Sequence, residues 1–180
     1  MLTVALELGR EGGWEAVQMR EVSDRADVAM GTLYRYFPSK EHLLVSVMLR
    51  QVKALADRLS VRPPTSADPV DRVVEVLRQA NSNLQREPQI TIATIRALVS
   101  GNAEIAPVVG EVRDSMRQII SDSLREESPN GDVSVAESRL LEIDLISDIW
   151  LAVLVSWISG VTQPEAIMPR LENASHALLG

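Results

Sequence analysis

The side chains best suited to binding chemistry lie in one short stretch, GTLYRYFPSK at residues 31–40. Both tyrosines of the chain, Tyr34 and Tyr36, and its only phenylalanine, Phe37, fall within four positions there. A tyrosine joins an apolar ring to a hydroxyl group that can reach a phosphate oxygen. Lys40 adds an ammonium group near the start of a helix, and the stretch contains no acid. These residues predict either a phosphate-binding surface or a small buried aromatic core.

Two short helices are needed to position these side chains. The sequence predicts the first near residues 19–26 and the second near residues 29–36, with a tight break between them. This layout is a helix-turn-helix, whose second helix enters the major groove of DNA, although two short helices also occur in many all-α proteins. The residues expected to close a small core are Val22, Ala26, Val28, Leu33 and Phe37. Those expected to lie more outward are Ala29, Met30, Thr32, Arg35 and Tyr36.

The segment AVQMREVSDRADVAMGTLYRYFPSKEHLL (residues 16–44) resembles the DNA-binding domain of TetR-family transcriptional repressors, and EGGWEAVQ before it fits the family's exit from its first helix. The resemblance implies an all-α fold. A DNA-binding domain at residues 1–46, with its motif at about 19–37, would precede an effector-binding and dimerisation domain at 47–180. The phosphate contacts that the resemblance implies are Gln18, Arg20, Thr32, Tyr34, Tyr36 and Lys40. The residues that it places along the groove are Ala29, Met30, Gly31 and Arg35.

The groove residues differ in the base contacts that they could make. Arg35 is able to bind a guanine with two hydrogen bonds, and Met30 and the Thr32 methyl group could touch thymine methyl groups. Gly31 lies inside a predicted helix, where glycine costs about 1 kcal/mol relative to alanine. Close approach to a DNA backbone would explain why it is there.

The net charge of −7 argues against a generally basic nucleic-acid binder, so DNA contacts must come from a local patch. Members of the family usually carry a basic stretch before and within the first helix, whereas this sequence begins Met1-Leu2-Thr3. Such an arm either lies outside this sequence or is absent. Without it we expect a weaker and less salt-dependent electrostatic contribution to binding.

The remaining sequence reads as helices, because apolar residues recur three and four positions apart without a sustained alternating run. A first helix at 2–10 should stop at Gly12-Gly13, and Ser39 should cap a long helix that runs to about Leu59. The proline-rich segment VRPPTSADP marks a boundary. Further helices are expected near 70–86, 89–100, 105–126, 135–159 and 165–179, with a loop at 127–134.

The helix expected at 135–159 is apolar almost all round, which predicts burial on several sides. Together with the last helix it could form a four-helix dimer interface, as the family generally does, or it could complete a monomeric core. The interface residues predicted on this basis are Leu151, Leu154, Trp157, Ile158, Leu171, Ala174 and Leu178.

ISDIWLAVLVSWISG, and REP before Gln89, are similar to the KstR-like branch of the family, repressors of steroid and cholesterol catabolism with steroidal or acyl-CoA ligands. This resemblance implies an apolar pocket in which Arg96 would meet a carboxylate or phosphate. The pocket residues predicted are Met48, Ile92, Ile95, Arg96, Val99, Met116, Ile120 and Trp150. Alternatively, the apolar residues are simply core and Arg96 pairs with a surface acid.

Several classes of function are excluded or disfavoured. The chain has no cysteine, which excludes disulfides and thiolate metal sites. The sequence also shows no metal-ligand cluster, no phosphate-cradling glycine motif and no nucleophile–base arrangement. We therefore expect no catalysis, no metal and no cofactor. The most hydrophobic run has 13 residues, against about 20 for a membrane span, which favours a cytoplasmic protein without membrane contact.

The sequence therefore predicts a homodimeric, ligand-responsive repressor that binds a palindromic double-stranded DNA operator and is released by a small apolar effector. The alternatives are a helical ligand-binding module with a degenerate head that does not bind DNA, and an enzyme that uses the apolar pocket.

Overall fold

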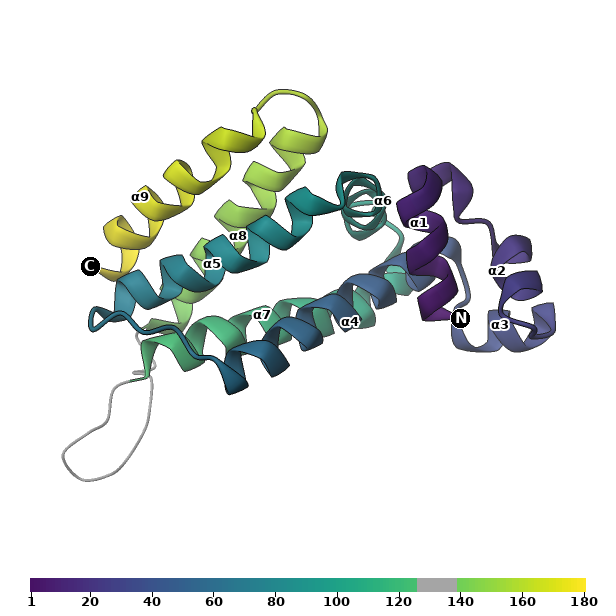
Figure 1. Ribbon diagram of the computed structural model, residues 1–180, viewed down its shortest axis with the longest axis horizontal. Coiled ribbons are helices and arrows are strands. Elements are labelled where there is room, and N and C mark those ends of the chain that lie inside the picture. Colours follow the sequence, from purple (N-terminus) through teal and green to yellow (C-terminus); the bar gives the residue numbers. More distant parts are fainter. Residues whose placement is uncertain (126–138) are drawn as a thin grey trace. The chain divides into compact units, whose positions relative to one another are not determined.

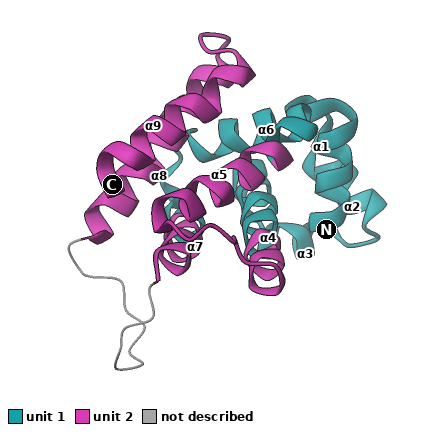
Figure 2. Ribbon diagram, turned by 60° about the vertical axis from the view of Figure 1, so that its left-hand side comes forward, with its two compact units in different colours: residues 1–53, 84–112 teal, residues 54–83, 113–180 magenta. Residues whose placement is uncertain are grey.

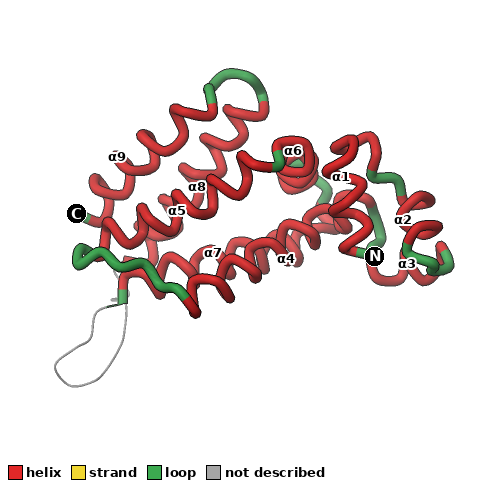
Figure 3. Tube along the Cα trace, in the orientation of Figure 1, coloured by secondary structure: helices red, strands yellow, loops and turns green. Residues whose placement is uncertain are grey.

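The computed structural model describes residues 1–125 and 139–180, and every regular element in these ranges is helical (Figures 1 and 3). The elements in chain order are α1 (Leu2–Ala16), α2 (Met19–Arg25), α3 (Met30–Tyr36), α4 (Lys40–Val61), α5 (Pro69–Arg86), α6 (Pro88–Leu98), η1 (Ala103–Ile105), α7 (Ala106–Leu124), α8 (Arg139–Ile158), η2 (Pro164–Ala166) and α9 (Ile167–Leu179). The predicted all-α class is confirmed.

Helix α1 differs from the prediction at its end. The expected break at Gly12-Gly13 is present, because Gly12 has φ −151° and Gly13 has a positive φ of 61°. The first helical segment therefore ends at this kink as predicted, and one further helical turn, which the prediction did not include, follows it and reaches Ala16. Glycine allows the backbone to leave the helical region for two residues and return to it.

Helix α4 begins as predicted. The Ser39 hydroxyl oxygen accepts a hydrogen bond from the His42 backbone N–H at 3.1 Å, which satisfies one of the unpaired donors of the first turn. The helix extends two residues beyond the predicted end, to Val61, and Pro63-Pro64 follow it. Helix α7 starts one residue late because a 3₁₀ turn precedes it, whereas the predicted loop at 127–134 and helix start at 135 lie outside the described residues.

The described chain divides into two compact units (Figure 2). Unit 1 contains residues 1–53 and 84–112, and unit 2 contains residues 54–83 and 113–180. These units follow packing and do not coincide with the functional boundary at residue 46, which stays a prediction. Within the described ranges, no single helix is long and apolar enough to cross a membrane; only α6 and the sharply bent segment after it would reach that length and apolarity together.

Unit 1 is held together by the packing of α1 against α6. An added Cβ atom at Gly9 would overlap the side chain of Ile90, so the two helices approach as closely as a glycine permits. Arg10 and Glu87 form an ion pair at 2.8 Å across the same pair of helices. This contact brings α6 beside the N-terminal helices that carry the candidate site (Figure 2).

Unit 2 contains the antiparallel pair α8 and α9, which turns at Gly160 with a φ of 74°. Arg117 binds the carboxylate of Asp144 through two hydrogen bonds of 2.8 and 2.7 Å, which joins α7 to α8. Arg78 and Glu172 join α5 to α9 at 2.5 Å. Ion pairs near the surface of the unit thus connect the helices that enclose its apolar interior.

Candidate nucleic-acid interface

Helices α2 and α3 are joined by a turn that the backbone closes tightly. Asp27 adopts a φ of 50°, a left-handed conformation that aspartate tolerates better than most side chains. The Ser23 hydroxyl donates to the Val28 carbonyl at 2.5 Å, and the Val28 N–H donates to the Ser23 carbonyl at 3.1 Å. This local bonding gives the two helices the layout of a helix-turn-helix, as the sequence predicts.

The small core of the motif is centred on Leu33 and Val22, both of which are fully buried. Ala26, Val28 and Phe37 are half-buried, so the Phe37 ring closes the edge of this core and not its centre. The Phe37 ring centroid lies 6.0 Å from that of His42, at the start of α4. The predicted core is thus present, with Phe37 less enclosed than expected.

The two tyrosines lie at the surface. Tyr34 is 45% exposed and Tyr36 is 56% exposed, so these two rings do not form a buried aromatic core. The Arg35 guanidinium carbon lies 5.3 Å from the Tyr36 ring centroid and is exposed. Gln18, Arg20, Ala29 and Gly31 are exposed as well, and Met30, Thr32 and Lys40 are half-buried. All ten predicted DNA contacts are therefore at least partly accessible.

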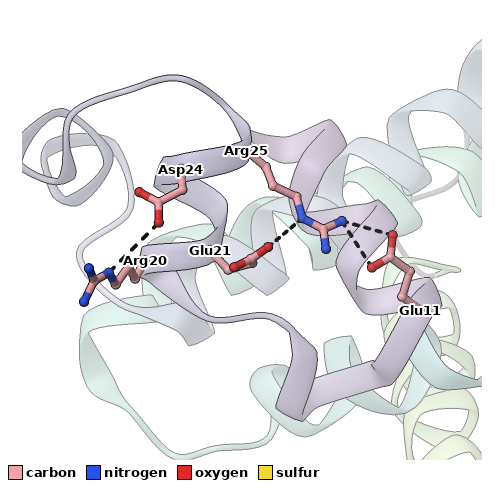
Figure 4. Close-up of polar contacts among 5 residues, drawn as sticks. All are labelled: Glu11, Arg20, Glu21, Asp24 and Arg25. Carbon is pink, nitrogen blue, oxygen red and sulfur yellow. Dashed lines mark hydrogen bonds and ion pairs between the residues drawn. The ribbon is translucent and has the colours of Figure 1, made fainter.

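An arginine–carboxylate network holds α2 on α1 (Figure 4). The Arg25 Nε atom donates to Glu21 at 2.7 Å, and its Nη1 atom donates to both oxygens of Glu11, at 3.1 and 3.2 Å. The hydrogen bonds that Arg25 donates to Glu21 and, to a smaller extent, to Glu11 raise the pKa of Arg25 above its ordinary value. Within residues 1–125 and 139–180, the ion-pair partner of Arg20 is Asp24, at 4.0 Å, and Arg20 is exposed. Arg25 is thus committed to the protein, whereas Arg20 can turn to a phosphate.

Lys40 has a partner that sequence reasoning missed. Its Nζ atom lies 4.3 Å from the centroid of the Trp14 ring, and the Arg96 guanidinium carbon lies 4.4 Å from the same centroid. Burial is the main cause that lowers the pKa of Lys40, and the positive charge of Arg96 adds to it. Trp14 lies just outside the stretch that suggested the motif, and its distance from Lys40 along the chain gave no signal of contact.

The predicted pocket residues fall into both units. Met48 and Ile95 are buried in unit 1, whereas Ile92 and Val99 are 41% and 46% exposed. Arg96 lies at the surface and pairs with Glu15 at 3.6 Å, which favours the alternative of a surface ion pair. In unit 2, Met116, Ile120 and Trp150 are buried. The lining of an effector pocket by these eight residues stays a prediction.

The interior of unit 2 contains polar atoms that have no hydrogen-bond partner among the described residues. They are Glu142 Oε2 on α8, whose residue is only half-buried, and three atoms of more enclosed residues: Asn81 Oδ1 on α5, Trp150 Nε1 on α8 and Ser175 Oγ on α9. Asn81, Trp150 and Ser175 are buried. A buried polar group without a partner costs about 1–3 kcal/mol, so each of these atoms calls for an explanation.

The predicted interface residues on α8 and α9 differ in accessibility. Leu154 and Leu171 are buried within the subunit, and the other five, Leu151, Trp157, Ile158, Ala174 and Leu178, are half-buried. Sequence reasoning did not select Leu140, Leu141 and Leu145, which are the exposed leucines of α8. Because this helix is apolar on nearly every face, its pattern could not distinguish inward from outward leucines.

Comparison with known proteins identifies the family. The model for bacterial regulatory proteins of the tetR family matches residues 1–47, and the model for the tetracyclin repressor-like C-terminal domain matches residues 67–178. The HTH-type transcriptional repressor KstR of Rhodococcus jostii (strain RHA1) is 38% identical over 180 residues, which cover 100% of this chain and 81% of the relative.

Solved structures agree with this result. A TetR transcriptional regulator from Rhodococcus sp. RHA1 has a TM-score of 0.84 and 37% identity, covering 99% of this chain and 92% of that one. FadR of Thermus thermophilus, a TetR-family repressor solved in complex with lauroyl-CoA, has the same fold, with a TM-score of 0.75 at 20% identity. The match covers 99% of this chain and 91% of the FadR chain. The chain belongs to the TetR family of bacterial regulatory proteins and is a DNA-binding transcriptional repressor.

Proposed function

We propose that this repressor binds a palindromic operator as a homodimer through residues 1–46, and that an apolar small-molecule effector held by residues 47–180 releases it. The observation that carries the DNA-binding half is the division of α3 into a buried and an exposed side. Leu33 is fully buried, whereas the neighbouring Tyr34 and Tyr36 are exposed. Exposed tyrosine hydroxyls beside cationic side chains suit phosphate oxygens.

Gly31 provides a direct test of the DNA-facing surface. A Cβ atom added there would meet nothing within 4 Å, so Gly31→Ala should leave the fold intact and stabilise α3 by up to about 1 kcal/mol. If the DNA backbone approaches this point, the same methyl group should weaken operator binding by about 2 kcal/mol through lost phosphate hydrogen bonds. Thermal unfolding and operator titration measure the two effects separately.

Gly110 in α7 is the matched control for Gly31. A Cβ atom there also meets nothing within 4 Å, so Gly110→Ala should gain stability without a change in operator affinity. Unchanged affinity in Gly31→Ala would remove this glycine from the DNA-binding surface.

For the effector, we propose a steroid or acyl-CoA metabolite that combines a large apolar body with polar groups. The KstR relative and the acyl-CoA complex of FadR support this class. The unpartnered Trp150 Nε1 and Asn81 Oδ1 atoms also support it, because a ligand could accept a hydrogen bond from the indole and donate one to the amide. The effector acts through its different affinities for the two states of the repressor, so the operator must weaken effector binding by the same factor.

Trp150→Phe tests the effector site with wild-type protein as reference. Genomic fragments bound by wild type are first selected, and steroid acyl-CoA and fatty acyl-CoA are then titrated onto the complex. At least one class should release wild type. Trp150→Phe should need about fivefold to tenfold more effector, the factor of one hydrogen bond, while its stability is equal or higher because an unpaired donor is gone.

Ser147→Ala is the control for this experiment, since Ser147 is half-buried on the same helix and its hydroxyl already donates to the Ile143 carbonyl. This variant should respond to effector as wild type does. Release by neither compound would contradict the effector class. Failure of wild type to bind any fragment specifically would contradict operator binding by this chain and favour the degenerate-head alternative.

A further inference from the structure

We propose that Arg96 on α6 is a positioning residue for DNA binding. By pairing with Glu15 it keeps that carboxylate away from Lys40, so the Lys40 ammonium group stays on the Trp14 ring and available to a phosphate. This inference rests on the proposed function, because it requires that Lys40 contacts DNA. Under this inference, the contact of Lys40 with DNA depends on Arg96, a residue of α6 that lies outside the helix-turn-helix.

The geometry joins four side chains from three helices of unit 1. Trp14 and Glu15 are neighbours on α1, Lys40 is the first residue of α4, and Arg96 lies on α6. Lys40 Nζ is 4.3 Å and Arg96 Cζ 4.4 Å from the Trp14 ring centroid. Arg96 Nη1 is 3.6 Å from Glu15 Oε1. One indole ring therefore attracts two cations, and one of them also binds the carboxylate beside it.

The charges around Lys40 show what this arrangement prevents. Among the residues that the structure describes, Lys40 forms no ion pair, although the negative charges of Glu15 and Glu41 favour its protonated form. Arg96 opposes that influence with its positive charge and holds the Glu15 carboxylate itself. Without Arg96, Glu15 is the carboxylate able to draw the Lys40 ammonium away from DNA, since opposite charges within a few ångströms attract strongly near a protein surface.

The contact between Arg96 and Glu15 depends on the position of α6 against α1. Close packing of Gly9 against Ile90 and the ion pair of Arg10 with Glu87 hold α6 on α1. The Arg96 and Glu15 side chains are 57% and 86% exposed, and an ion pair so exposed to water is weak and exchanges readily. A small shift of α6 would therefore release Glu15 and change the charge balance at Lys40 without any rearrangement inside the helix-turn-helix.

The test measures operator affinity over a range of salt concentrations for Arg96→Gln, Lys40→Gln and both together. Arg96→Gln should weaken binding about twofold to fivefold, the factor of one exposed charge contact. Lys40→Gln should reduce the dependence of log affinity on log salt by about 0.9 per head. In the Lys40→Gln background, Arg96→Gln should cause no further loss, and adding Glu15→Gln to Arg96→Gln should restore binding.

Lys53→Gln is the matched control, because Lys53 in unit 1 forms an exposed ion pair with Glu111 at the same 3.6 Å separation but does not hold α6 on α1. It measures the effect of simply losing one positive charge from unit 1 and should change affinity less than Arg96→Gln. An equal loss from Arg96→Gln with and without Lys40 would overturn the inference while leaving the proposed function standing. An unchanged salt dependence in Lys40→Gln would instead remove Lys40 from the DNA contacts, and the inference with it.

Discussion

Leu33→Ala is expected to destabilise the helix-turn-helix by about 2–5 kcal/mol, the usual cost of truncating a fully buried leucine. Leu33 is the single buried residue of α3, whose seven residues are too few to hold a helix without packing. Loss of this contact should release α3 and abolish operator binding at temperatures where wild type binds. Hydrogen exchange of the α2 and α3 amides, together with operator titration, measures both consequences.

Tyr34→Phe is the matched control on the next residue of the same helix. It removes one exposed hydroxyl group and leaves the ring in place, so amide protection should be unchanged. Operator affinity should fall by about 1 kcal/mol if the hydroxyl binds a phosphate. Wild-type amide protection in Leu33→Ala would show that another residue closes the core of the motif.

Arg72→Lys is expected to lower the free energy of unfolding of unit 2 by about 2 kcal/mol, although it keeps the positive charge. The Arg72 guanidinium donates to four backbone carbonyls. These belong to Ser123 at 2.8 Å, Ser66 at 3.2 Å, Ala67 at 3.1 Å and Arg125 at 3.2 Å. Two of these lie at the C-terminal end of α7, where helix carbonyls lack internal partners. A lysine ammonium cannot span all four acceptors, so some would lose their donor.

The measurement is chemical denaturation with a probe on unit 2, and Arg78→Lys serves as control. Arg78 forms one exposed ion pair with Glu172, for which a lysine can substitute, so a change below about 0.5 kcal/mol is expected. If Arg72→Lys lowered the free energy of unfolding as little as Arg78→Lys, the positive charge of Arg72 and not its several hydrogen-bond donors would explain its contribution to stability. Arg72→Met, which removes the donors and the charge, would then separate the two effects.

The features that the sequence predicted well depend on neighbours along the chain. A Ser39 cap needs only the first turn of its own helix, and the break at Gly12-Gly13 needs only glycine's freedom to adopt a positive φ. The helix-turn-helix is also local, since its turn is closed within a few residues by Ser23 and Val28. Periodicity could therefore place these elements before any tertiary contact was known.

The features that the sequence left open have a different origin. Periodicity shows that a helix has apolar faces but not which of them meets a neighbour, so it could not show that Ile92 and Val99, predicted to line a pocket, are exposed. The same ambiguity affects α8, where burial of Leu154 and exposure of Leu141 follow from packing partners far away in sequence. Only tertiary structure could assign these faces.

By itself, the sequence determined that this chain is an all-α regulator with a helix-turn-helix. The reason is that helix periodicity, turn-forming residues and the family motif all depend on residues that are neighbours along the chain. The tertiary structure decided which side chains share an environment. It alone showed that Trp14, Lys40 and Arg96 meet, since three helices separated along the chain must first pack before their side chains can touch. It also showed that Tyr34 and Tyr36 face solvent while Leu33 is buried, because burial is a property of the surrounding fold and not of residue type.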